Sequence, residues 1–146
     1  MNTMAPPRPT ELHECRVRLT AAATAAGEAR RWVRAAIRAR HAPVDADIAV
    51  LLTSDLVTNA IRHEAGDTVV LAVRCGHGRL RVEVHGTSRF RPGQADVPAD
   101  AETWPGLVLV ALLSDEWGFY RTPAGKAVYF ALAYQPDLAG GRPGAG

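Results

Sequence analysis

The stretch from Asp45 to Glu64, which reads DADIAVLLTSDLVTNAIRHE, constrains this chain more than any other segment. An aspartate placed to cap the first turn, strong helix formers and a Gly-Asp turn just beyond the end predict a single helix. At about 100° per residue, apolar and polar residues fall on the same arc of this helix. The apolar members are Ile48, Leu51, Leu52 and Leu56, and the polar members are Asp55, Asn59 and His63.

This polar stripe requires an explanation. A carboxylate, an amide and an imidazole on a core-facing arc need hydrogen-bond partners inside the protein or a cavity that they line. Val50, Val57 and Ile61 lie on the opposite side of the same helix, which is therefore apolar on two sides. The pattern predicts an inner helix with a polar pocket along one side.

Length and composition indicate one globular domain. The chain has 146 residues, of which 47% are hydrophobic and 22% charged, with a formal net charge of only +2 and Lys126 as its sole lysine. These values are typical of ordinary globular proteins. The longest apolar run, from Leu107 to Leu113, is too short to span a bilayer, and the N-terminal residues do not resemble a signal peptide. We therefore expect a cytoplasmic protein in which Cys15 and Cys75 are reduced.

The predicted elements follow the order β, α, α, β, β, α, β, β. Short glycine-containing links between consecutive strands indicate antiparallel hairpins. This order predicts an α+β two-layer sandwich, with a mixed, mostly antiparallel sheet and the helices on one face. The strands are expected over 12–19, 68–74, 79–86, 117–120 and 127–134, and the helices over 21–40, 45–64 and 105–113. Residues 1–10 are expected to form a disordered leader and residues 136–146 a flexible tail.

The strand over 79–86 alternates regularly. Leu80, Val82 and Val84 share one face, Arg81, Glu83 and His85 share the other, and parity places Gly86 on the buried face. A polar loop without periodicity follows over residues 87–103, and loops of this length are usually lids, binding loops or disordered segments.

The segment DLVTNAIRH (55–63) resembles the N-box of the ATPase domain shared by histidine kinases, gyrase B and Hsp90. The whole arrangement is most similar to a small single-domain branch, the anti-sigma-factor serine kinases. The resemblance covers about residues 12–134 and implies a Bergerat-type, histidine-kinase-like ATPase domain over residues 11–135. It is also carried by RVEVH (81–85), PGLVLV (105–110), DEWG (115–118) and GKAV (125–128).

The resemblance implies a site for ATP and Mg²⁺. The position of Asn59 normally holds Mg²⁺, which takes oxygen ligands and shares them with the nucleotide phosphates. The position of Asp55 is normally a glutamate that orients or deprotonates the nucleophile, and aspartate is one methylene shorter. His63 is expected to contact phosphate or to have a purely structural role. The other implied nucleotide-binding positions are Gly86, Ser88, Gly106, Leu107 and Lys126.

The sequence departs from the family at the adenine site. There the family has an aspartate that accepts the adenine amino hydrogen, and this chain has Gly86. An acceptor is then available only from water, a backbone carbonyl or a neighbour such as Thr87 or Ser88. Loss of a charged acceptor costs about 1.5–3 kcal/mol.

The lid motif, normally glycine-any-glycine-leucine, departs as well. Here it reads Trp104-Pro105-Gly106-Leu107, so that a large side chain replaces the first glycine and Pro105 removes one N–H donor. We expect Trp104 either to fill the vacated nucleotide pocket or to lie on the surface. Together with Gly86, this motif predicts weakened nucleotide binding.

Three functions are compatible with the sequence. The first is a regulatory protein of the anti-sigma-factor and serine-kinase-like family that sequesters a partner, either a sigma factor, an anti-sigma-factor antagonist or both. The second is an active serine kinase that phosphorylates the antagonist, with Asp55 as base and Asn59 as the Mg²⁺ ligand. The branch is often dimeric, so a homodimer is a further expectation, and we expect no membrane partner.

The third and least favoured function is a nucleic-acid-binding module. It is suggested by a basic helix face. A simpler interpretation is that this face is exposed to solvent, so we expect no direct contact with nucleic acid. This face is formed by Arg30, Arg31, Arg34 and Arg38.

Overall fold

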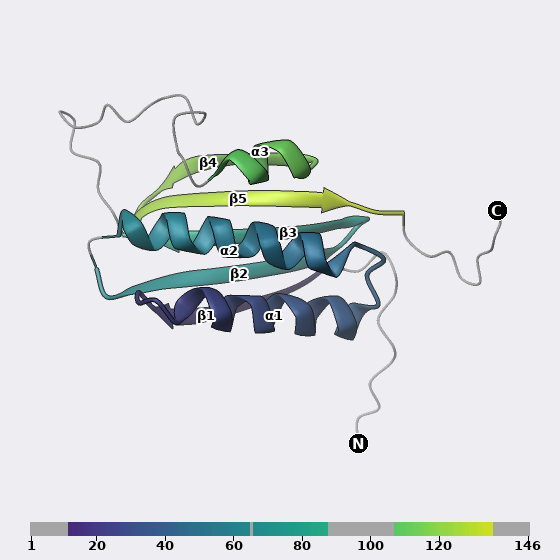
Figure 1. Ribbon diagram of the computed structural model, residues 1–146, viewed down its shortest axis with the longest axis horizontal. Coiled ribbons are helices and arrows are strands. Elements are labelled where there is room, and N and C mark those ends of the chain that lie inside the picture. The colour runs from purple at the N-terminus through teal and green to yellow at the C-terminus, as the bar shows by residue number, and fades with distance from the viewer. Residues whose placement is uncertain (1–11, 65, 88–106, 136–146) are drawn as a thin grey trace, which may run out of the picture.

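Eight elements make up the structure, a computed structural model that describes residues 12–64, 66–87 and 107–135 (Figure 1). Their order is the predicted one, and the largest boundary difference is that the first helix begins at Ala25 rather than at residue 21. The expected leader and tail, together with Ser88, Trp104, Pro105 and Gly106, lie outside the described residues. The elements are β1 (His13–Thr20), α1 (Ala25–Arg40), α2 (Ala46–Arg62), β2 (Thr68–Gly76), β3 (Arg79–Gly86), α3 (Val108–Leu113), β4 (Glu116–Thr122) and β5 (Gly125–Ala133).

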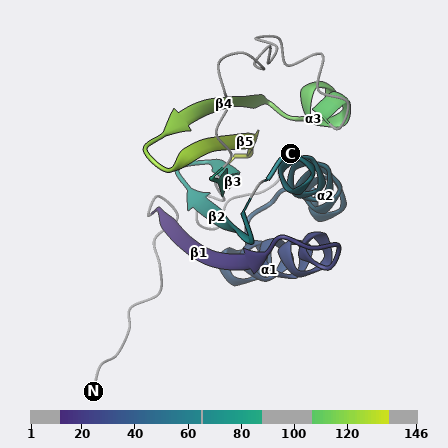
Figure 2. The ribbon, with the colours of Figure 1, turned by 90° about the vertical axis from the view of Figure 1, so that its left-hand side faces the viewer.

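The five strands form one sheet in the order β1-β2-β3-β5-β4. Every neighbouring pair is antiparallel, so the described sheet contains none of the parallel pairing that a mixed sheet would have. All three helices cover the same face of the sheet (Figure 2). The predicted α+β two-layer sandwich is therefore confirmed. None of the helices in the described ranges is long and apolar enough to cross a membrane.

The β2–β3 hairpin closes through a two-residue turn at His77 and Gly78. Both residues have positive φ, 55° and 77°, as a two-residue hairpin turn of this kind requires. Gly76 pairs with Arg79 across the turn, so β2 continues two residues beyond its predicted end. The hairpin prediction was thus correct in kind, and the observed link is shorter.

The helix α2 is capped as its sequence predicts, because the Asp45 side chain accepts hydrogen bonds from the N–H groups of Asp47 and Ile48 at 3.0 and 3.1 Å. It lies between α1 and α3 in the helical layer (Figure 2).

The buried arc of α2 is rotated from the predicted one. Leu52 and Leu56 are buried as expected, but Leu51 is 42% exposed. The rotation arises because α1 packs on the side of Val50 and Val57 and buries both of them; on that side Arg30 donates a hydrogen bond to Ser54 at 2.7 Å.

The helix-free face of the sheet carries a buried carboxylate. The alternation of side chains along β3 correctly predicts that Glu83 lies on this face. It does not predict that Glu83 is buried, with only 1% of its surface exposed. Its carboxylate accepts hydrogen bonds from Arg81 Nε at 2.5 Å and from the Tyr120 hydroxyl at 2.8 Å, and His85 Nε2 lies 2.9 Å from it. The Arg81 guanidinium also stacks on the Tyr129 ring, 3.8 Å from its centroid. Side chains from β4 and β5 thus close over the glutamate.

The environment of Glu83 makes its contribution to stability depend on pH. Burial raises the pKa of this carboxyl, but the hydrogen bonds from His85, Tyr120 and Arg81 outweigh burial and hold the pKa at about 2, below the usual 4.5. A depressed pKa means that the ionised carboxylate stabilises the fold above pH 4.5, and that this stabilisation is lost as the pH falls toward about 2.

We expect Glu83→Gln to lower the free energy of unfolding by about 3 kcal/mol at pH 7, since the pKa falls from 4.5 to about 2 and each pKa unit corresponds to about 1.4 kcal/mol. The difference from the wild type should narrow steadily below pH 4.5. Urea unfolding at several pH values measures it. Glu116→Gln is the control, because Glu116 is exposed and accepts a hydrogen bond from Arg79 at 3.0 Å; it should have little effect. A Glu83→Gln difference that does not change with pH would contradict the assignment.

Candidate functional site

A small cavity lies at the C-terminal end of α2, where this helix meets the end of β3 and the start of β5. Its volume is about 20 Å³. Four predicted site residues share its wall, namely Asn59, His63, Gly86 and Lys126. We call it the Asn59 cavity, and its lining is completed by Ala60, Glu64, Val84 and Val128.

Asn59 is the least satisfied polar side chain of this site. It is 2% exposed, and in the described part of the chain neither its Oδ1 nor its Nδ2 has a hydrogen-bond partner. Thr53 on the same helix is also buried, but its hydroxyl donates to the Ala49 carbonyl at 2.8 Å. A buried polar group without a partner costs about 1–3 kcal/mol. The cavity beside Asn59 exceeds the roughly 10–15 Å³ that one water molecule needs, so a water or a ligand atom can satisfy the amide.

Two basic side chains, Lys126 and His63, lie in the wall of the Asn59 cavity. Lys126 is 8% exposed, and burial together with Arg121 lowers its pKa to about 8. Burial also lowers the pKa of His63, assisted by the nearby charges of Lys126 and Arg62. The Lys126 ammonium thus disfavours protonation of the His63 imidazole, and an anionic group beside the two would reduce that effect.

Glu64 connects the end of α2 to the end of β3, and sequence reasoning missed it. Its carboxylate accepts hydrogen bonds from the backbone N–H of Thr87 at 3.0 Å and of Gly66 at 2.6 Å, and from the Thr87 hydroxyl at 2.5 Å. The sequence offered the Thr87 hydroxyl as a substitute contact for adenine. In the structure this hydroxyl donates its hydrogen bond to Glu64 instead. Only its position four residues before the hairpin strand, beside the Gly-Asp turn, marked Glu64 in the sequence.

Close backbone contact fixes the floor of the cavity. A Cβ atom at Gly125 would lie 2.3 Å from the Gly86 carbonyl oxygen, so glycine is required where β5 begins. This contact holds Lys126 and Gly86 opposite each other, as their pairing in the β3–β5 ladder also shows.

The remaining predicted site residues lie elsewhere. Asp55, one turn before Asn59, is half-buried, and burial raises the pKa of its carboxyl; it does not line the Asn59 cavity. Leu107 is 1% exposed and belongs to the apolar core at the start of α3. Ser88 and Gly106 lie outside the described residues.

As the described residues form it, the Asn59 cavity is small and offers few groups to a ligand. No group of three or more histidine, cysteine, aspartate or glutamate residues within the described ranges is able to hold a metal ion. Asn59 offers one amide oxygen to Mg²⁺, which needs further oxygen ligands such as phosphates. Ligand pockets usually measure about 300–1,000 Å³, far more than this cavity. The donors present fit a water molecule or one edge of an anionic group.

Comparison with known proteins supports the fold. No protein-family model and no curated protein matches the chain. Among solved structures it is similar to the crystal structure of the RsbU and RsbW domains of Rv1364c from Mycobacterium tuberculosis, with a TM-score of 0.61 and 18% sequence identity. The match covers 84% of this chain and 32% of that chain. A likeness at this level of identity extends to the α+β architecture alone.

The unsatisfied amide of Asn59 should lower the stability of the protein. We expect Asn59→Leu to raise the free energy of unfolding by about 1–2 kcal/mol, since a similar-sized apolar side chain removes the unsatisfied amide. Urea unfolding of the ligand-free protein measures it. Thr53→Val is the matched control, because it removes a satisfied hydrogen bond on the same helix, and it should lower stability instead. If Asn59→Leu is destabilising, the amide is already satisfied, by the protein or by a water molecule in the cavity.

Proposed function

We propose that this chain is a regulatory protein that sequesters a partner protein and binds nucleotide only weakly. The observation that carries the proposal is the Asn59 cavity. The sequence resemblance assigns nucleotide binding to four of its residues, yet its volume is about 20 Å³. Gly86 offers no side chain to an adenine. The fold shared with the structure of the RsbU and RsbW domains of Rv1364c is consistent with this class of protein.

Exposed apolar side chains support a role in protein binding. The short helix α3 leaves four large apolar residues in contact with solvent, of which Leu112 is 71% exposed. A concentration of such residues on one element is typical of a protein–protein interaction site. The others are Val108, Leu109 and Leu113. We assign this face to the partner, a sigma factor or an anti-sigma-factor antagonist.

An active serine kinase is the second candidate. The raised pKa of Asp55 is in the direction that suits a general base, and the unsatisfied Asn59 amide remains available to a ligand. This function requires the Asn59 cavity to widen before a nucleotide enters. If ATP and Mg²⁺ bind, Asn59 would contribute to holding the metal, and Lys126 and His63 would face the phosphates.

Calorimetric titration with Mg·ATP and Mg·ADP tests the weakened site. We expect no saturable binding below about 100 µM, because a lost charged acceptor alone lowers affinity by roughly one to two orders of magnitude. Gly86→Asp restores the carboxylate and should recover part of that affinity. Low-micromolar binding to the wild type would overturn the proposal of a weakened site.

Partner binding is tested separately with purified sigma factors and antagonist proteins from the source organism, by interferometry with and without Mg·ATP. Sequestration predicts binding that does not depend on nucleotide and that survives Asn59→Ala. Leu112→Glu should abolish it, whereas Arg31→Glu on the exposed face of α1 is the matched control. Transfer of the γ-phosphate to the antagonist, lost in Asp55→Asn, would establish the kinase instead.

A further inference from the structure

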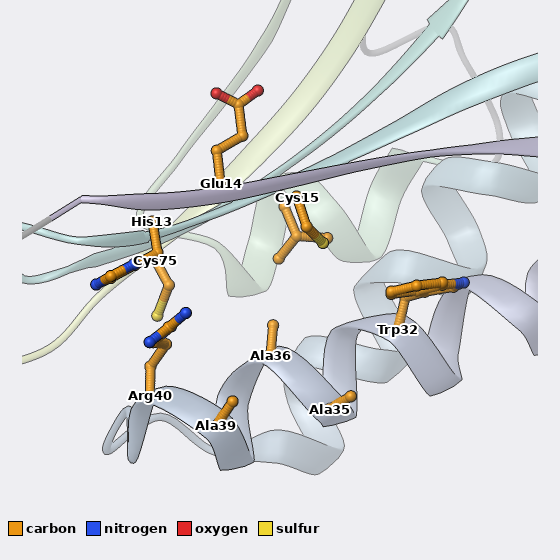
Figure 3. Close-up of a pocket in the computed structure, with 10 residues that line it drawn as sticks. His13, Glu14, Cys15, Trp32, Ala35, Ala36, Ala39, Arg40 and Cys75 are labelled. Carbon is orange, nitrogen blue, oxygen red and sulfur yellow. The ribbon is translucent and has the colours of Figure 1, made fainter. Parts of the chain in front are cut away.

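A second cavity, larger than the first, lies between α1 and the edge of the sheet formed by β1 and β2 (Figure 3). Its volume is about 210 Å³, which exceeds the roughly 150 Å³ apolar cavity that accepts benzene. We call it the α1 cavity. It shares no residue with the Asn59 cavity, and its lining consists of His13, Glu14, Cys15, Trp32, Ala35, Ala36, Ala39, Arg40, Val73 and Cys75.

The α1 cavity exists because α1 presents small side chains to the sheet. Ala36 is half-buried beneath the strands, Ala35 and Ala39 lie at the exposed rim, and their methyl groups leave space that leucine would fill (Figure 3). Trp32 lies at one end of this row and Arg40 at the other. The two are separated by eight residues, or about 12 Å of helix. The cavity is therefore elongated, with an aromatic ring at one end and a guanidinium at the other.

The strand side of the α1 cavity is largely apolar. Val73, Cys15 and Cys75 contribute to it, and burial raises the pKa of both thiols, so both are neutral near pH 7. The described side chains include no cluster able to bind a metal here. Neutral thiols pack as small apolar groups. These walls suit a hydrocarbon body.

The other end of the α1 cavity is cationic. Arg40 lies close enough to Cys75 to oppose the effect of burial on that thiol's pKa. Within the described ranges, no salt bridge joins Arg40 to a carboxylate. The carboxylate of Glu14 points to the opposite face of the sheet (Figure 3), where it lies 2.8 Å from Arg16 and 3.5 Å from Arg74. Among the described side chains, the guanidinium thus has no carboxylate partner inside the cavity.

We propose that the α1 cavity binds a small monocarboxylate with an apolar body. The carboxylate pairs with the Arg40 guanidinium, which presents donors in a fork that matches two carboxylate oxygens. The body lies along the alanine row toward Trp32. Burial of the body provides affinity, and the charge pair provides selectivity for an acid over a neutral analogue. This site is independent of the proposed nucleotide and partner sites.

Titration of the full chain with octanoate tests the proposal, with octanamide as a neutral analogue of the same length. We expect saturable binding of octanoate, and binding of octanamide about tenfold weaker or more, as a charge-assisted pair implies. Backbone amide NMR shifts should change at Ala35, Ala36 and Ala39 and not at Asn59. Failure of octanoate to bind at millimolar concentration, or equal binding of the two compounds, would overturn the proposal.

Variants separate the two parts of the site. Arg40→Gln should weaken octanoate about tenfold and make it equal to octanamide. Arg38→Gln is the matched control, because Arg38 is exposed in the same last turn of α1, and it should bind as the wild type does.

Ala36→Leu fills the cavity and should abolish binding of both compounds. Cys15→Leu fills it from the strand side, and circular dichroism identifies which filled variant is folded. Unchanged binding in a folded, filled variant would place the ligand elsewhere.

Discussion

The burial of α2 between the sheet and its two neighbouring helices is the constraint on which the rest of the structure depends. Leu52 and Leu56 are completely buried, and α1 and α3 occupy the flanks of the helix (Figure 2). Rotation of α2 would expose these leucines or the valines packed beside α1, so apolar burial fixes its orientation. This orientation places the amide of Asn59 inside the protein, beside the end of β3 and the start of β5.

Features that depend on local sequence were predictable, and those that depend on distant contacts were not. The Asp45 cap, the element order and the β2–β3 hairpin follow from short patterns, and all are observed. The burial of Glu83 depends on tyrosines from β4 and β5, whose register with β3 no local pattern reveals. The orientation of α2 depends likewise on α1.

The same distinction between local sequence patterns and distant contacts applies to the candidate site. Family resemblance brought together Asn59, His63, Gly86 and Lys126, and these four share a cavity wall. Asp55 and Leu107 came from the same resemblance, and neither lines that cavity. The α1 cavity had no motif to mark it, because a row of alanines on a helix reads as ordinary packing until the strands opposite it are known. The volume of the α1 cavity depends on how α1 packs against β1 and β2, which the sequence of α1 alone does not determine.

Lys126 has a consequence for experimental chemistry. It is the sole lysine of the sequence, so the protein has a single side-chain amine, and this amine belongs to the wall of the Asn59 cavity. A pKa of about 8 gives it more of the reactive free-base form at neutral pH than a surface lysine has, while its burial limits access. The rate at which an acylating reagent modifies this one position would therefore report directly on how often the cavity opens to solvent.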